Sequence, residues 1–93
     1  MIMPRPKKHR TTNCDPAANY FKPRGIPMSD LTEEILEKDE LEAINLADLK
    51  GLSHEESAAR MKVSRATFGR ILKSARSKIA DCIINGKAIK INK

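Results

Sequence analysis

The sequence predicts an all-α protein: a helix-turn-helix bundle of about four helices behind a basic, irregular N-terminal arm. Three observations predict this class. All five prolines lie within the first 28 of the 93 residues, which leaves the rest of the chain free to form helices. Beyond residue 28, Ser and Asp residues stand before amphipathic runs as N-caps stand before helices. Only three residues are aromatic, which limits the chain to one modest core.

The arm, residues 1–28, is expected to be mostly irregular. Proline removes a backbone donor and disfavours helix at the residue before it. Residues 1–12 are expected to be mobile, as chain termini commonly are. Tyr20-Phe21-Lys22 is the only dense apolar piece of the arm, and we expect it to dock on the domain as a short strand.

The helical domain is expected over residues 29–86. Ser29 is a suitable N-cap for a short first helix that runs to about Leu36. Leu31 and Ile35 are spaced as neighbours on one face of that helix. The acidic residues near its start favour the positive end of the helix dipole.

Three further helices are marked by their own caps. Asp39 caps the first of them, and Gly51 ends it. Ser53 and Glu56 form the capping box of the next, in which each side chain accepts a bond from a free backbone amide. Ser64 caps the last, which contains no proline and extends for about 20 residues, or ~30 Å. The expected helices end near residues 50, 61 and 85.

The C-terminal tail, residues 87–93, is expected to hold a brief strand. From Lys87 to Ile91 polar and apolar side chains alternate, which is the period of a strand. We expect this segment to pair with Tyr20-Phe21, so that the two ends of the chain meet.

Charge is distributed in three blocks. Residues 1–28 carry a net +5, residues 29–58 carry −8 and residues 59–93 carry +9, within a total of +6. Such a molecule has a strong dipole, which attracts a polyanion to one side and orients it on approach. The acidic block must then point away from phosphates, into solvent or towards a basic partner.

The third and fourth expected helices carry the pattern of a helix-turn-helix, which we place at residues 53–73. A small residue stands where the helices cross, and apolar residues stand on both sides of the turn and on the inward face of the last helix. These positions are Ala58, Met61, Val63, Phe68 and Ile71.

The last helix has one apolar face and one cationic face. The apolar stripe consists of Phe68, Ile71, Leu72, Ala75, Ile79, Cys82 and Ile83. The opposite face holds small and positively charged residues, with no acid before Asp81. Because a merely solvated face would usually mix both signs, this face fits insertion into the major groove of DNA.

The groove is ~12 Å wide, so only the first turns of the last helix can enter it. Candidate contacts to base edges are Arg65, Ala66, Thr67, Gly69 and Arg70. Candidate contacts to phosphates are Ser53, His54, Lys62, Ser64, Lys73 and Arg76. In the arm, Arg5, Lys7, Lys8 and Arg10 are candidates for the minor groove, with a solubilising tail as the equal alternative.

Two positions in this region carry a conformational cost. Gly69 within a helix costs about 1 kcal/mol relative to alanine, which close approach to nucleic acid or to another helix would explain. Lys62 stands at the turn position that favours glycine, and a left-handed conformation there costs about 1 kcal/mol or more.

The stretches Gly-Leu-Ser-His-Glu-Glu-Ser-Ala-Ala-Arg-Met and Val-Ser-Arg-Ala-Thr-Phe-Gly-Arg-Ile-Leu resemble region 4 of sigma factors, the promoter-binding helix-turn-helix. With Pro-Arg-Pro-Lys-Lys and Tyr-Phe-Lys-Pro-Arg-Gly-Ile-Pro, nearly the whole chain resembles a prokaryotic family of uncharacterised predicted DNA-binding proteins, domain-of-unknown-function family 134. The resemblance implies a regulatory DNA-binding protein. Ser57 departs from the pattern, since the motif usually has an apolar residue there.

Other functions are disfavoured. The acids lie at caps and on helix surfaces rather than as a paired acid and base, so we expect no enzyme and no cofactor. His9 and Cys14 lack the further ligands that a metal needs, so no metal is expected, and Cys82 is expected in the core. No apolar segment approaches bilayer length and the start lacks a signal sequence, so the chain is expected in the cytoplasm without a membrane partner.

The sequence therefore predicts a sequence-specific binder of double-stranded DNA that regulates transcription. A homodimer is the expected assembly, with the exposed Ile84 in its contact, and RNA polymerase is a further candidate partner. The alternative is a protein-interaction module that engages the transcription machinery through its acidic helices. RNA binding is less favoured because aromatic stacking platforms are few.

Overall fold

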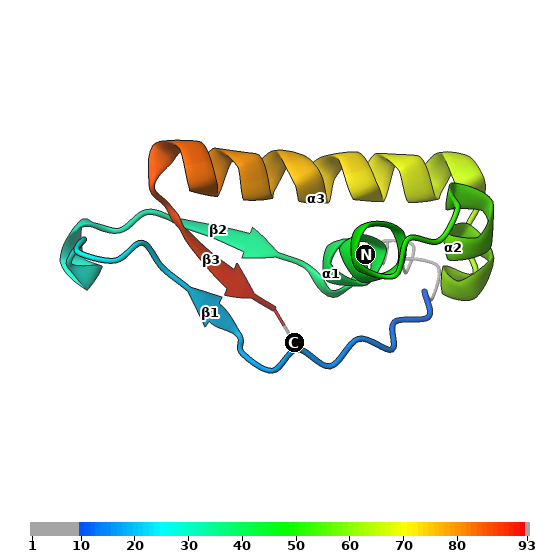
Figure 1. Cartoon of the computed structure of the whole chain (residues 1–93), viewed down its shortest axis with the longest axis horizontal. Coiled ribbons are helices and arrows are strands. Elements are labelled where there is room, and N and C mark those ends of the chain that lie inside the picture. The colour runs from blue at the N-terminus through cyan, green and yellow to red at the C-terminus, as the bar shows by residue number, and fades with distance from the viewer. Residues whose placement is uncertain (1–9, 93) are drawn as a thin grey trace, which may run out of the picture.

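A computed structural model describes residues 10–92 (Figure 1). Residues 1–9, which form most of the segment expected to be mobile, lie outside the described residues. They include the predicted DNA contacts Arg5, Lys7 and Lys8 and the candidate metal ligand His9. In chain order the elements are β1 (Tyr20–Phe21), η1 (Met28–Asp30, a 3-10 turn), β2 (Glu33–Leu36), α1 (Lys38–Ile44), η2 (Asn45–Leu49, a π-helix), α2 (His54–Met61), α3 (Arg65–Asn85) and β3 (Ala88–Ile91).

The all-α prediction is wrong, because three short strands form a sheet beside the helices and make the fold mixed α/β. The strand order is β1-β3-β2, so the C-terminal strand lies in the middle. β1 pairs with β3 antiparallel, with Tyr20 opposite Lys90, which is the terminal pairing we expected. β2 pairs with the other edge of β3 in parallel, with Glu33 opposite Ala88.

The short helix predicted from Ser29 to Leu36 is also wrong, since this segment forms η1 and then β2. Its apolar residues do not share a buried face: Ile35 is 45% exposed and Leu36 is 4% exposed. The backbone is instead satisfied by β3, where the Ala88 N–H donates to Thr32 O at 2.9 Å. Pairing with a strand far along the chain overrides the local helical spacing.

α1 begins slightly earlier than predicted, with Glu37 rather than Asp39 at its N-cap. Glu37 and Glu40 form a capping box, in which the Glu37 N–H donates to Glu40 Oε1 at 2.9 Å. The Asp39 side chain is therefore available for a contact outside the helix. The helical turns continue through η2, and Gly51, with φ +70°, follows as the expected stop.

α2 and α3 begin at the predicted caps Ser53 and Ser64, but only the Ser53 half of the capping box predicted for α2 forms, because the Glu56 carboxylate pairs with Arg60 instead. The Ser53 hydroxyl accepts from the Glu56 N–H, and the Ser64 hydroxyl accepts from the Thr67 N–H, both at 3.1 Å. Between the helices, Lys62 adopts the left-handed conformation, with φ 56° and ψ 44°. This residue turns the chain sharply, and α3 then runs for 21 residues.

α3 connects two hydrophobic clusters, and Figure 1 shows it running along most of the long axis of the molecule. The first cluster packs α1, η2 and α2 against the first half of α3 around Met61 and Phe68. The second joins Leu36 of β2 and Ile91 of β3 to Ala75 of α3. Each helix within residues 10–92 is too short or too polar to cross a lipid bilayer.

The predicted apolar stripe of α3 is wrong at Ile83, which is 72% exposed. Cys82 takes the inward position, buried as expected, and its thiol donates to Ala88 O at 3.6 Å. Because β3 folds back over the Cys82 side of the helix, Ile83 stays in solvent beside the exposed Ile84.

Candidate nucleic-acid interface

The first half of α3 exposes most of the side chains that were predicted to contact base edges. Arg65, Ala66 and Arg70 are exposed, and Thr67 and Gly69 are half-buried. Phe68 is fully buried beneath them and fixes the rotation of α3 about its axis. The exposed face therefore contains two arginines and small residues, without an acidic side chain of α3 itself.

The predicted phosphate contacts at the start of α2 and at the turn are exposed as well: Ser53, His54, Lys62 and Ser64. The Ser64 hydroxyl also donates to Thr67 Oγ1 at 2.9 Å. The His54 ring meets the Phe68 ring edge-on, with 5.4 Å between the ring centroids. This contact gives His54 a packing role between α2 and α3.

The cations of this surface differ in whether an acid holds them. Arg76 is held in a two-pronged pair by Asp48, with distances of 2.6 and 3.2 Å. The hydrogen bond from Arg76 lowers the pKa of Asp48. Arg65 lies 3.6 Å from Glu55, and both side chains are largely exposed. Among the described residues, Arg70 and Lys73 form no ion pair.

The arm is bonded to the folded domain at its first described residues. Arg10, predicted to enter the minor groove, forms an ion pair with Asp39 of α1. The Thr11 N–H donates to Met61 O at 3.1 Å, at the end of α2. The Asn13 N–H donates to Glu42 Oε1 at 2.7 Å.

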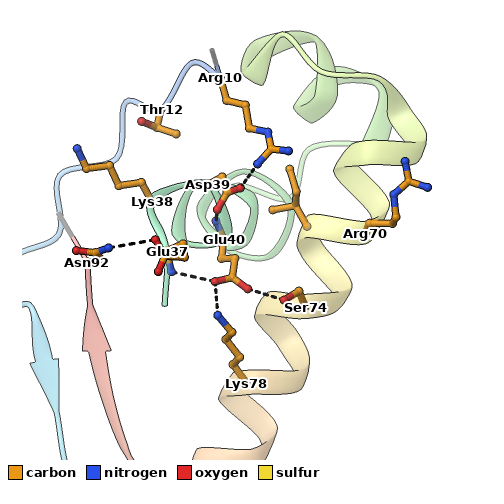
Figure 2. A pocket seen from close by; sticks show the side chains of 11 residues that line it. Arg10, Thr12, Glu37, Lys38, Asp39, Glu40, Arg70, Ser74, Lys78 and Asn92 are labelled. Carbon is orange, nitrogen blue, oxygen red and sulfur yellow. Dashed lines mark hydrogen bonds and ion pairs between the residues drawn. The ribbon is translucent and has the colours of Figure 1, made fainter. Parts of the chain in front are cut away.

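The expectation that the acidic block lies in solvent or against a separate partner is wrong for two buried carboxylates of α1. Glu40 is 5% exposed and Glu42 is 3% exposed. Glu40 accepts from Ser74 Oγ at 2.6 Å and from Lys78 Nζ at 2.8 Å (Figure 2). Burial raises the pKa of Glu40, but the bonds from Lys78, Ser74 and the Glu37 N–H outweigh it, so the pKa lies below its ordinary value.

A cleft of about 670 Å³ separates the arm from α3. Its walls come from the arm, the start of α1, α3 and the end of β3. Figure 2 shows Arg10 directed at Asp39 on one wall, and Arg70 extending from α3 on the other. The walls carry both signs of charge. The acidic side chains would repel a small anion, so the cleft does not have the character of an anion-binding site.

Sequence reasoning missed the acids that organise this region: Asp39, Glu40 and Asp48. Asp48 lies 28 positions from Arg76, and Glu40 lies 38 positions from Lys78, so local spacing could not pair them. The available signal was the opposite sign of the charge blocks, which predicts contacts between blocks but not which residues meet.

Gly69 has open space around the position where a side chain would begin. No heavy atom of another element lies within 4 Å of a Cβ built there. The crossing of another helix of this chain therefore does not account for the glycine.

Metal-binding residues do not gather in the described part of the chain. Within residues 10–92, no three His, Cys, Asp or Glu side chains are grouped to hold a metal ion. Cys14 is half-buried and Cys82 is buried, and both are free thiols.

The structure defines a small mixed α/β protein in which a short capped helix and a sharp turn precede a long helix with a cationic exposed half. The family described as "Protein of unknown function DUF134" matches residues 1–93, and the chain belongs to this family. This confirms the resemblance to that family.

The chain is similar to UPF0251 proteins of several organisms. A UPF0251 protein of Caldanaerobacter subterraneus subsp. tengcongensis is 60% identical over 89 residues, which are 96% of this chain and 75% of that relative. One from Desulfosudis oleivorans is 55% identical over 89 residues, 96% of this chain and 64% of the relative. One from Vibrio vulnificus is 54% identical over 87 residues, 94% of this chain and 87% of the relative. No solved structure matches the chain.

Proposed function

We propose that this protein binds double-stranded DNA sequence-specifically and regulates transcription, with the first half of α3 lying in the major groove. The observation that carries the proposal is the exposed face of α3 around Arg70 and Lys73. Among the described residues no acid pairs with these two cations. An arginine free of carboxylates can form two parallel hydrogen bonds to a guanine.

The shape of this surface favours insertion of α3 into a groove of the partner rather than contact with a flat partner. α2 and the turn at Lys62 hold α3 so that its buried side, which includes Phe68, packs against Met61 of α2, and its opposite side is in solvent. At 1.5 Å per residue the 21 residues of α3 extend about 30 Å, whereas the groove is ~12 Å wide. The first turns can enter, and the later turns remain with the sheet.

Gly69 supports the same orientation. A helical glycine costs about 1 kcal/mol relative to alanine, and no atom of another element lies within 4 Å of the position that a Cβ of residue 69 would occupy. Close approach of a base pair or a sugar-phosphate strand would account for a residue without a side chain at this point of the face.

The surface suggests a distinct role for each cation. Arg70 would contact base edges, and Lys62 and Lys73 would contact phosphates on either side. Arg65 and Arg76 are paired with Glu55 and Asp48, so each would have to break its ion pair before it could contact a phosphate. The cost of breaking these pairs reduces the net contribution of the two arginines to the free energy of DNA binding. The likeness to sigma region 4 in sequence adds support, and two copies on neighbouring half-sites would supply the second contact surface that one such motif lacks.

The alternative, docking through acidic helices, draws less support from the structure. Glu40 and Glu42 are buried, and Asp39 and Asp48 are engaged by Arg10 and Arg76. These acids stabilise the fold and offer little free charge to a separate protein.

The test begins with selection of bound duplexes from a random DNA library, followed by titration of the selected duplex and a scrambled one at two salt concentrations. We expect affinity to fall with a log-log slope near 0.9 per phosphate contacted. Arg70→Ala should erase most of the preference for the selected duplex. Lys73→Ala should weaken both duplexes alike and lower the slope by about one.

The matched control is Arg24→Ala, which removes the same charge from an exposed position. Arg24 belongs to the segment between β1 and β2. Figure 1 shows this segment reaching the end of the molecule opposite α2. This variant should retain the preference. Salt-independent binding, or an Arg70→Ala protein with the wild-type preference, would contradict the proposal.

A further inference from the structure

The second half of α3 carries an exposed apolar patch, which consists of Ala80, Ile83 and Ile84. Ile83 is 72% exposed, Ile84 is 79% exposed, and Ala80 is exposed as well. Ala80 precedes the two isoleucines by three and four positions, so the three side chains are neighbours on one face of the helix. Clustered apolar side chains on a surface commonly mark a contact with another molecule, whereas single ones need no explanation.

The charges of α3 around the apolar patch are already neutralised. Residues 77–85 include two charged side chains, and both are paired. Lys78 Nζ donates to Glu40 Oε1 at 2.8 Å, and Asp81 Oδ2 accepts from Lys87 Nζ at 2.7 Å. The apolar patch therefore offers little to DNA or to a strongly charged protein.

The net charge of the chain favours such a surface for contact between two copies. Because each copy carries +6, two copies repel one another at most orientations. The repulsion is least where both present a surface without free charge. The apolar patch is such a surface, and the first half of α3, with Arg70 and Lys73, is not.

The apolar patch and the proposed DNA surface lie on the same side of α3, at different positions along it. Ala80 stands seven positions after Lys73, which is about two turns of helix. Ile84 stands 14 positions after Arg70, which is about 21 Å at 1.5 Å per residue. The core packs on the other side of the helix, around Phe68 and Ala75.

We propose that the apolar patch pairs with the same patch of a second copy of this chain, with the two α3 helices parallel. In a symmetric pair each residue meets its counterpart. Ala80, being small, lets the two helices approach, and the isoleucines fill the space beside it. This inference rests on the proposed function for its purpose and deepens it, because it names the surface that joins two DNA-bound copies.

The parallel arrangement follows from the cations of the first half of α3. Arg70 and Lys73 of one copy would face those of the other, and like charges repel. The two helices therefore diverge from the apolar patch towards their first halves. A duplex lying between the diverging helices would neutralise this repulsion, so DNA and the second copy should each favour binding of the other.

The contact is small, which sets its strength. Three residues per copy supply far less than the roughly 1,200–2,000 Å² buried in a stable interface, so we expect a weak dimer in the absence of DNA. Added salt should strengthen this dimer, because it screens the repulsion between the exposed cations.

A cross-linking experiment tests the arrangement without DNA. In a Cys14→Ser background, Ala80→Cys places one thiol in the apolar patch, while Cys82 remains buried. In a parallel pair the two introduced thiols face each other, and oxidation with diamide should join the chains by a disulfide. The matched control is Leu49→Cys, at an apolar residue of η2 that is 80% exposed, and it should yield far less of the joined species.

Ile84→Lys tests the apolar contact itself. It should weaken self-association about 10-fold or more in sedimentation equilibrium, because apolar burial is lost and two charges are brought together. Leu49→Lys makes the same change at a similarly exposed position and should leave self-association unchanged. On the duplex selected by the wild type, wild-type copies should bind in pairs with cooperativity, and Ile84→Lys should remove the cooperativity. Thermal unfolding measures any change in the fold of either variant.

The outcomes separate the two proposals. Equal cross-linking of Ala80→Cys and Leu49→Cys, or self-association that Ile84→Lys leaves intact, would overturn pairing through the apolar patch. A selected duplex that binds a single copy would overturn the role of the pair on DNA. Pairing through the apolar patch in a chain that binds no DNA would instead overturn the proposed function.

Discussion

At the scale of single residues, Lys62 in the α2–α3 turn and Gly69 in α3 each carry a residue type that local backbone preference does not favour. Lys62 adopts φ 56° despite its side chain, a conformation that costs roughly 1 kcal/mol or more for a residue other than glycine. Gly69 has no such requirement, since it lies within regular helix and has open space around it. The fold would thus favour a glycine at position 62, where the chain has lysine, but it does not account for the glycine at position 69, which directs attention to an external partner there.

Gly69→Ala tests this point with two opposite readouts. Alanine should raise the free energy of unfolding by about 0.5–1 kcal/mol, because it improves helix propensity without meeting any neighbour. The same methyl group should weaken binding to the selected duplex. Denaturant titration and DNA titration measure the two effects. Ser77→Ala, on the exposed side of α3, serves as the control that should leave DNA affinity unchanged. A more stable Gly69→Ala protein with full affinity would contradict close approach of DNA at this position.

At the scale of elements, one buried carboxylate holds three of them together. Glu40 of α1 accepts from Ser74 and Lys78 of α3, and Lys78 Nζ also donates to Ile35 O of β2 at 2.7 Å. The central part of α3 is thereby tied to both α1 and the sheet. Since the first half of α3 carries the proposed DNA surface, this contact sets how that surface is presented.

Glu40 makes stability depend on pH in the acidic range. Its folded pKa lies below the ordinary value of 4.5, so its stabilising contribution is complete above about pH 4.5 and is lost as the pH falls through the folded pKa. Glu40→Gln should lower the free energy of unfolding by about 1–3 kcal/mol at pH 7, and the difference from wild type should shrink at acidic pH. Denaturant titrations across pH 3–7 measure this. Glu55→Gln, at a largely exposed carboxylate, should change little, and a pH-independent difference for Glu40→Gln would contradict the assignment.

At the scale of the whole molecule, the sheet is assembled from both ends of the chain. β3 lies between β1 and β2, which do not pair with each other. A side-chain contact nevertheless spans the sheet, because Tyr20 Oη donates to Glu33 Oε2 at 2.5 Å. This bond raises the pKa of Tyr20 above its ordinary value of 10.0. Tyr20 is the single tyrosine of the chain, so its titration reports on the sheet alone.

A chain that ends at Lys87, and so lacks β3, should lose the raised pKa of Tyr20. Without β3, β1 and β2 have no common strand to hold them in register, so the pKa of Tyr20 should return to about 10. Absorbance of the tyrosinate during alkaline titration measures the change. Glu33→Gln in the full chain should lower the Tyr20 pKa while the sheet remains. An unchanged Tyr20 titration in the shortened chain would mean that β1 and β2 associate without β3.

Much of the helical half could be predicted because its signals are local. The hydroxyl caps Ser53 and Ser64 bond to amides three residues away, and the stop at Gly86 acts within its own turn. The exposed cations of α3 followed from helical period alone. The errors concern distant partners: the helix predicted over residues 29–36 is replaced by η1 and the strand β2, and Ile83 is exposed rather than in the core. The pairing of Arg10 with Asp39, 29 positions away, was likewise not predicted.

By itself, the sequence determined where α2 and α3 begin and end, which face of the first half of α3 is apolar, and that the opposite face is cationic. These properties depend on side chains within a few turns of one another. Only the tertiary structure decided that residues 33–36 form a strand, that Glu40 and Glu42 are buried, and which acids hold Arg10 and Arg76. Those outcomes depend on groups brought together from 28 or more positions apart, whose meeting is set by the packing of the whole chain rather than by any local preference.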